Sequence, residues 1–142
     1  MRLPAAVTIV LSLLFPAAAD ARCRTHINTA WLGTPVVHKR LFATTLSTAW
    51  CFNGRRVTRV RRVRVYPSLT RLGTIASWEY RGVSARDGRL VAVRGTARRA
   101  YRLRRVVHWR RCAARCFYLY LEMNSLLYWD GRAGQANRLR RG

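Results

Sequence analysis

Side chains alternate between apolar and basic residues along much of this chain, with a period of two. The clearest example begins at Tyr101, where Leu103, Val107 and Trp109 share one parity and the other parity is mostly arginine. Successive side chains of a β-strand point to opposite faces, so this period predicts strands with one buried face and one solvated face. No convincing helical stretch exceeds two turns. We therefore expect an all-β protein.

Turn signals divide the alternating segments into about seven or eight expected strands, the first being Arg24 to Leu32. Three dipeptides typical of hairpin turns follow: Asn53-Gly54, Asp87-Gly88 and Asn124-Ser125. The first is the strongest, because it separates an aromatic-rich run from a run rich in valine. In the second of these runs Val60 breaks the parity of Val57 and Val63, which predicts a bulge or a twisted edge.

These elements predict a small antiparallel β-sandwich or a partly open barrel, stapled by disulfides. A single curved sheet covered by a short helix near residues 94–100 is the alternative. Residues 22–133 are expected to form one domain. Residues 134–142 are basic with little to bury, and we expect them to be a flexible tail.

The first 21 residues have the pattern of a signal peptide. Met1 and Arg2 give a positive start, and an apolar run from Ala5 to Phe15 precedes the small residues of Ala19-Asp20-Ala21. We expect cleavage after Ala21 and secretion of the remainder. Retention as a membrane anchor is the alternative, but the run is shorter than the roughly 20 residues that a span needs.

Four cysteines follow the expected cleavage site: Cys23, Cys51, Cys112 and Cys116. An even number in an exported chain predicts two disulfides, and the sequence permits three connectivities. We favour Cys112 with Cys116, because a tight turn between them would bring their Cα atoms close enough, and Cys23 with Cys51. A zinc site is the alternative, but the paired C-x-x-C spacing is missing. No metal or cofactor is expected.

The formal net charge is +23, with 28 Lys and Arg against five Asp and Glu, and Lys39 is the single lysine. Many side chains of two arginine runs are expected to share a sheet face, with Tyr118 and Tyr120 as an exposed aromatic ledge; the runs are Arg55, Arg56, Arg59, Arg61, Arg62 and Arg64, and Arg98, Arg99, Arg102, Arg104 and Arg105. The sequence leaves open whether the two runs face one way, which would favour binding, or scatter around the surface, which would not. Such guanidinium arrays suit anionic polymers at a cell envelope, such as wall phosphate polymers, extracellular nucleic acid or anionic lipid. The alternative is a solvated surface biased to arginine by genome composition.

Catalysis has little material in this sequence. Asp87 and Asp130 precede glycines and are explained as turn formers, which leaves Glu79 and Glu122 for acid–base chemistry. A small secreted wall-degrading hydrolase using that pair is the alternative function. The three histidines lack the partners of a catalytic triad. We expect a binding protein and no enzyme.

Three motifs carry a family resemblance: Trp50-Cys51-Phe52-Asn53-Gly54, Trp78-Glu79-Tyr80-Arg81-Gly82, and Cys112 with Cys116 before a final aromatic hairpin. In these motifs the chain resembles a group of small, uncharacterised, secreted actinobacterial proteins. The chain departs from the group in its arginine content and in Asn124-Ser125, where the group tends to have Asn-Gly. The resemblance implies a secreted β domain and transfers no catalytic residue.

Overall fold

A computed structural model describes residues 22–34 and 39–142, so the predicted signal peptide lies outside the described residues. The described part forms seven strands and one short helix: β1 (Arg22–Gly33), β2 (Arg40–Phe52), β3 (Val57–Leu69), α1 (Arg71–Ile75), β4 (Trp78–Ala92), β5 (Arg99–Cys112), β6 (Cys116–Leu127) and β7 (Ala133–Arg141). Among these residues, no helix has the length and apolar content that a bilayer span requires.

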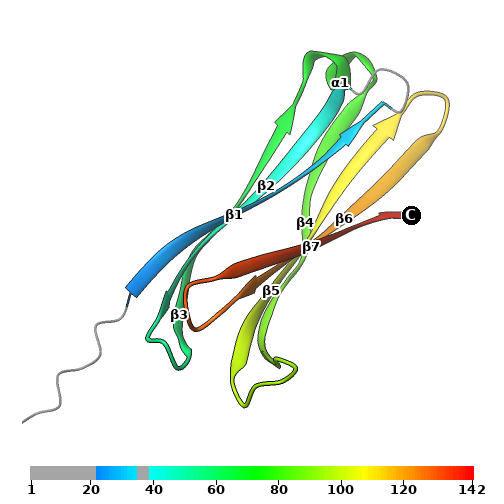
Figure 1. The fold of residues 1–142 in the computed structure, drawn as a ribbon. Coiled ribbons are helices and arrows are strands. Elements are labelled where there is room, and N and C mark those ends of the chain that lie inside the picture. Colours follow the sequence, from blue (N-terminus) through cyan, green and yellow to red (C-terminus); the bar gives the residue numbers. More distant parts are fainter. Residues whose placement is uncertain (1–21, 35–38) are drawn as a thin grey trace, which may run out of the picture.

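The strands form two antiparallel sheets, in the orders β1-β2-β3 and β4-β5-β6-β7. Figure 1 shows them as the two layers of an elongated sandwich, with α1 at one end connecting β3 to β4. The predicted all-β sandwich of seven or eight strands is confirmed. Thr70 caps α1, because its hydroxyl accepts a hydrogen bond from the Gly73 amide at 3.0 Å.

The core lies between the sheets and follows the predicted parity of β5. Leu103, Val107 and Trp109 are buried against residues of β2. The rings of Phe42 and Trp109 stack with centroids 4.1 Å apart, and the Trp109 indole donates to the Thr44 hydroxyl at 3.0 Å. An indole N–H needs such a partner when it is buried.

The Asn53-Gly54 hairpin is confirmed between β2 and β3, and Gly54 has a φ of 82°. The predicted turn at Asp87-Gly88 is wrong, because both residues lie inside β4 opposite Arg104 and Leu103. Gly88 is needed there for a different reason: a Cβ at this position would meet Cζ of the Tyr101 ring at 2.6 Å.

The predicted turn at Asn124-Ser125 is also wrong, because both residues are buried inside β6. The Asn124 side chain donates to the Glu122 carboxylate and to the Ala136 carbonyl, each at 3.2 Å. The chain reverses later, at residues 128–132, where Gly131 has a φ of 86°. Burial of a polar pair between strands therefore overrides its local turn preference.

Two further expectations are corrected. Residues 94–97 form a turn, with Gly95 at a φ of 79°, in place of the helix considered near residues 94–100. The expected flexible tail is instead β7, which pairs with β6 from Leu127↔Ala133 to Leu119↔Arg141. The side chains of β7 bury little apolar surface, so its backbone hydrogen bonds with β6 are what place it in the sheet.

The expected bulge in β3 is confirmed. Register with β2 shifts between Ser47 and Ala49, and opposite this break Arg62 adopts a φ of 53°. A second shift lies between Cys51 and Phe52, where β3 again has one extra residue. The two extra residues together bring Val57, Val60 and Val63 to positions against the core.

Both favoured disulfides are confirmed. Cys23 and Cys51 are directly opposed on β1 and β2, and Cys112 and Cys116 close the turn between β5 and β6. These two disulfides use all four cysteine sulfurs, so none is available as a zinc thiolate ligand.

Candidate functional site

The two arginine runs lie on different sheets. The first occupies the β2–β3 turn and β3, an edge strand of one sheet. The second occupies the end of the β4–β5 turn and β5, an inner strand of the other sheet. The chain changes sheets through α1, so the solvent-facing residues of β3 and β5 face opposite sides of the sandwich. Arg59 and Arg64 are exposed on one side, and Arg102 and Arg104 face outward on the other. The runs therefore do not form one array on a single sheet face.

The two runs meet at one end of the sandwich, which we call the turn end because the turns at residues 53–56, 93–98 and 128–132 lie there (Figure 1). An open groove of about 500 Å³ separates the first two turns. Each run contributes two arginines to this turn-end groove: Arg55 and Arg56, and Arg98 and Arg99. Val57 and Leu90 add apolar lining.

Local hydrogen bonds fix the β2–β3 side of the groove. The Asn53 side-chain oxygen accepts from the backbone amides of Arg55 and Arg56, both at 2.9 Å. Gly54 supplies the positive φ that the turn requires, and its amide donates to the Trp129 carbonyl at 2.9 Å. The Asn53-Gly54 turn therefore fixes the backbone positions of Arg55 and Arg56 in the groove.

Contacts of Arg98 connect the three turns. Its guanidinium donates to the Gly54 carbonyl at 2.7 Å and lies 5.7 Å from the centroid of the Trp129 ring. The Trp50 indole donates to the Tyr128 carbonyl at 3.2 Å, which ties the third turn to β2. The turn-end groove is thus built on cross-linked turns rather than on independent loops.

Carboxylates are absent from this groove among the described residues. The ion pairs of the described chain involve five arginines, namely Arg81, Arg104, Arg110, Arg132 and Arg140. All four groove arginines are exposed and belong to none of these pairs. The guanidinium forks of Arg55, Arg56 and Arg99 are therefore available to phosphate or carboxylate groups of another molecule, whereas Arg98 also holds the Gly54 carbonyl.

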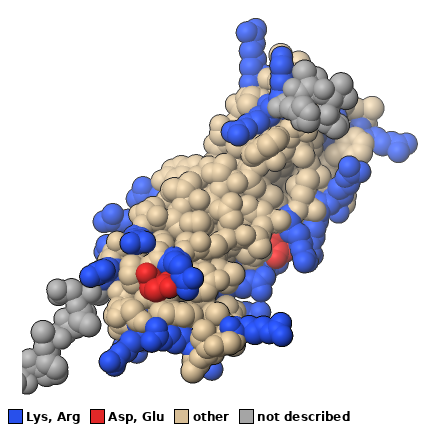
Figure 2. Space-filling view, in the orientation of Figure 1, with Lys and Arg blue, Asp and Glu red and all other residues tan. Residues whose placement is uncertain are grey.

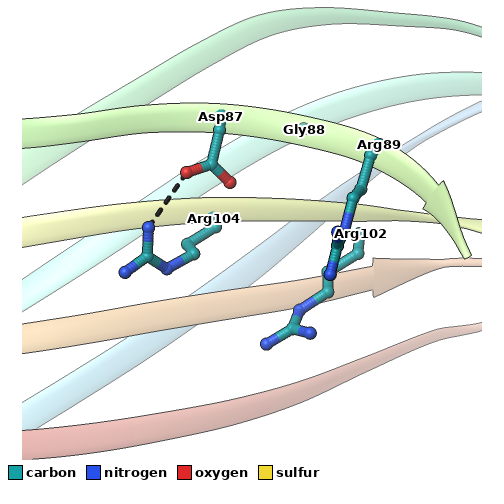
Figure 3. A pocket seen from close by; sticks show the side chains of 5 residues that line it. All are labelled: Asp87, Gly88, Arg89, Arg102 and Arg104. Atoms are coloured by element: carbon teal, nitrogen blue, oxygen red, sulfur yellow. Dashed lines mark hydrogen bonds and ion pairs between the residues drawn. The ribbon is translucent and has the colours of Figure 1, made fainter.

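The outer face of the second sheet has a different charge balance. A shallow depression of about 430 Å³ is lined by Asp87, Gly88, Arg89, Arg102 and Arg104 (Figure 3). Arg104 is paired with Asp87 at 3.0 Å, whereas Arg89 and Arg102 are direct cross-strand neighbours and lie side by side in Figure 3. Like charges in this position repel each other, so an anion between them would be stabilising.

A neighbouring depression of about 340 Å³ shares Arg102 and extends along the β4–β5 hairpin to Arg94, with Leu126 and Tyr128 in its lining. The outer face of this hairpin therefore has a basic track beside the turn end. Arg89 and Arg94 were not among the predicted site residues. Reading Asp87-Gly88 as a turn hid Arg89, which shares the parity of Asp87 in β4.

Glu122 and Glu79 are both held in ion pairs. Glu122 is buried, and a hydrogen bond from Asn124, with support from Arg104 and Arg140, holds its pKa below the ordinary value. A hydrogen bond from Arg110 likewise lowers the pKa of the exposed Glu79. Their cross-strand partners on β5, Val106 and Arg110, are four residues apart, which is roughly 13 Å along the sheet. A hydrolytic pair is roughly 5–10 Å apart and includes an acid of raised pKa, so this arrangement does not favour hydrolysis.

The two candidate tyrosines lie away from the turn-end groove. Tyr118 is exposed near the β5–β6 turn, at the opposite end of the sandwich. Tyr120 is half-buried, with its ring 4.5 Å from that of His108. The aromatic side chain that accompanies the groove is instead Trp129.

Comparisons with protein-family models, curated proteins and solved structures find no significant match. The placement of side chains therefore carries the functional argument. Figure 2 shows that Lys and Arg gather toward both ends of the visible face, around a broad centre without charged side chains.

Proposed function

We propose that this protein is an exported, non-catalytic binder of extended anionic polymers, and that the turn-end groove is its main contact. The observation that carries the proposal is the convergence of Arg55, Arg56, Arg98 and Arg99 in one open groove, whose lining contains no carboxylate from the described part of the chain. These arginines come from both runs, which are otherwise on opposite sides of the molecule.

The chemistry of the groove suits a polymer better than a single small ion. Each guanidinium can donate two parallel hydrogen bonds to a phosphate or carboxylate, and the groove is open to solvent. The basic track from Arg94 to Arg102 offers further anion contacts beside it. A linear polyanion that follows both features would release counterions at each contact, which makes its binding strongly salt-dependent.

Two features support export. The segment from Met1 to Ala21 has the pattern of a signal peptide, and two disulfides are typical of proteins that fold in an oxidising compartment. The proposed ligands are accordingly extracellular or envelope polymers that carry phosphate or carboxylate groups.

The test is retention on an immobilised polyanion over a range of salt concentrations. We compare the native protein with Arg55→Gln/Arg56→Gln/Arg99→Gln, which leaves the contacts of Arg98 with Gly54 and Trp129 in place. The salt dependence of binding is expected to lose a slope of about 2–3, because each phosphate contact contributes roughly 0.9.

The matched control is Arg59→Gln/Arg64→Gln/Arg115→Gln, which removes the same charge from exposed arginines outside the groove. The control is expected to retain most of the slope. Equal losses in the two triple variants would show that net charge, and not the groove, governs retention, and the proposal would then be wrong.

A further inference from the structure

The end of the sandwich opposite the turn end exposes many large apolar side chains. Figure 1 places α1 and the β5–β6 turn at this end. Exposed apolar residues of these segments and of the adjoining strands are Leu69, Leu72, Ile75, Phe117, Tyr118 and Leu139. Ile75 is 71% exposed and Phe117 is 60% exposed, which is unusual for side chains of this size. We call this region the apolar end.

A groove of about 520 Å³ opens at the apolar end. It is lined by residues of β1, β4, β5, β6 and β7, so both sheets contribute to it; its apolar lining comprises Leu32, Trp78, Phe117, Tyr118, Leu119 and Leu139. Because Leu119 is buried and Phe117 is exposed, the groove connects the edge of the core with solvent. Its lining is therefore suited to hydrocarbon.

A covalently closed turn holds Phe117 in its exposed position. Phe117 directly follows Cys116, which is bonded to Cys112 across the turn. Phe117 and Arg111 are paired in the β5–β6 ladder, and the amide of Gly142 donates to the Tyr118 carbonyl at 3.0 Å. The backbone that carries the exposed ring is thus held by strand pairing and by the disulfide.

Basic residues accompany the apolar side chains. Arg111 and Arg141 line the groove, and Arg71 and Arg115 are exposed on α1 and on the β5–β6 turn. Gly142 also lines the groove, but among the described residues no Asp or Glu side chain does. Glu79 follows Trp78 in β4, but it is paired with Arg81 at 3.0 Å and Arg110 at 2.8 Å.

We propose that the apolar end docks on a bilayer containing anionic phospholipids. Phe117, Leu139 and neighbouring apolar side chains would enter the boundary between headgroups and acyl chains, while Arg111 and Arg141 contact lipid phosphates. An apolar centre beside arginines without acidic side chains is complementary to an anionic membrane surface, which is apolar inside and negatively charged outside. This surface is separate from the turn-end groove, so it does not depend on the proposed polymer binding.

The test measures sedimentation of the purified protein with phosphatidylcholine vesicles, with and without phosphatidylglycerol. The native protein is expected to bind the anionic vesicles. Phe117→Ser is expected to weaken this binding roughly tenfold through the loss of buried apolar area. Arg111→Gln and Arg141→Gln are each expected to weaken it roughly fivefold, and only on the anionic vesicles.

Leu90→Ser is the matched control, since Leu90 is an apolar residue of similar exposure, 51% against 60% for Phe117, and lies at the turn end. It should leave vesicle binding unchanged. Equal losses in Leu90→Ser and Phe117→Ser would overturn the proposal, as would the absence of vesicle binding. Two other occupants would also overturn it: a dimer in solution that Phe117→Ser dissociates, or a soluble fatty acid whose binding needs Phe117 when vesicle binding does not.

The two proposals fail separately. Phe117→Ser should leave retention on a polyanion column unchanged, because the residue lies at the opposite end from the turn-end groove. The triple variant of Arg55, Arg56 and Arg99 should leave the Phe117-dependent part of vesicle binding intact. Loss of this dependence in the triple variant would show that the turn end, and not the apolar end, contacts lipid.

Discussion

Replacement of Glu122 by glutamine tests whether carboxylates neutralise the arginines on the outer face of the second sheet. Glu122 is 8% exposed and lies 3.4 Å from both the Arg104 Nε and an Arg140 terminal nitrogen. It also accepts a hydrogen bond from Asn124 at 3.2 Å. Glutamine preserves the shape and the acceptor oxygen but removes the charge. The variant therefore isolates the electrostatic contribution.

The structure limits the expected loss of stability. Loss of one partner from a fully buried ion pair costs about 3–5 kcal/mol, but the Arg140 side chain is 59% exposed and an exposed pair contributes at most about 1 kcal/mol. Arg104 is 33% exposed and keeps its contact with Asp87 at 3.0 Å. We expect Glu122→Gln to lower the free energy of unfolding by about 1–2 kcal/mol, which corresponds to a fall in Tm of about 4–8 °C.

The effect should depend on pH in a defined direction. The hydrogen bond from Asn124, followed by Arg104, lowers the pKa of folded Glu122 below its ordinary value of 4.5. A lowered pKa means that the carboxylate contributes its full stabilisation above 4.5 and loses it as the pH falls through the folded pKa. The stability difference between the native protein and Glu122→Gln should therefore be complete at neutral pH and shrink below pH 4.5.

Binding of polyanions should change in the opposite direction. Without the Glu122 carboxylate, Arg104 and Arg140 carry less compensated charge on the face beside the basic track. Retention on a polyanion column should thus increase although thermal unfolding, followed by circular dichroism, occurs at a lower temperature. Glu79→Gln is the control. Loss of this exposed carboxylate should raise retention, and because its ion pairs are exposed, the Tm should change little. Unchanged Tm for Glu122→Gln, together with reduced retention, would refute this reasoning.

Three further substitutions test the fold that supports these surfaces. Asn28→Ala should cost about 2–4 kcal/mol in urea unfolding, because the buried Asn28 bonds across to Asn137 at 2.7 Å and its loss leaves buried polar groups unpaired; a cost below about 0.5 kcal/mol would contradict this role. Replacement of Cys23 and Cys51 by serine should cost about 3–4 kcal/mol from loop-closure entropy over a separation of 28 residues, and an unchanged urea midpoint would contradict it. Gly131→Ala should lower the Tm, because a Cβ there meets the Phe52 ring at 2.5 Å and the φ is 86°; an unchanged Tm would show that the turn rearranges freely.

The strands and the Cys112–Cys116 disulfide were predictable because their signals are local. Leu103, Val107 and Trp109 share one parity, which predicted that they face the core, and all three are buried in the structure. The short spacing of Cys112 and Cys116 requires a turn, and a turn is present. Turn prediction failed where a residue that is common in turns lies inside a strand because of its tertiary contacts. Gly88 makes room for Tyr101, and Asn124 is buried between strands.

The candidate site was less predictable, because sequence alone does not assign strands to sheets. The sequence leaves open whether the two arginine runs face one way, and the crossing through α1 places β3 and β5 in opposite layers. The convergence of Arg55 with Arg98 depends on the true position of the second hairpin turn, at residues 93–98. A hairpin turn at Asp87-Gly88 would put Arg98 along a strand and away from the turn, so this prediction did not bring Arg98 close to Arg55.

The positions of the carboxylates show which arginines are available to a ligand. Glu79, Asp87 and Glu122 lie on the outer face of the second sheet, where they pair with arginines of β4, β5 and β7. Asp130, the fourth acidic side chain of the described residues, lies in the 128–132 turn at the turn end, where Arg132 pairs with it at 2.6 Å. Genome composition would explain the number of arginines, but it does not explain why the other three carboxylates gather on one face. Among the residues that the structure describes, no Asp or Glu side chain lines the turn-end groove or the apolar-end groove, so no acidic side chain in either lining offsets the charge of its arginines. A variant that moves a carboxylate into the turn-end groove, such as Ala97→Glu, should therefore reduce polyanion retention more than Ser84→Glu, which adds the same charge at an exposed position of β4. Equal reductions in retention would show that net charge alone controls binding.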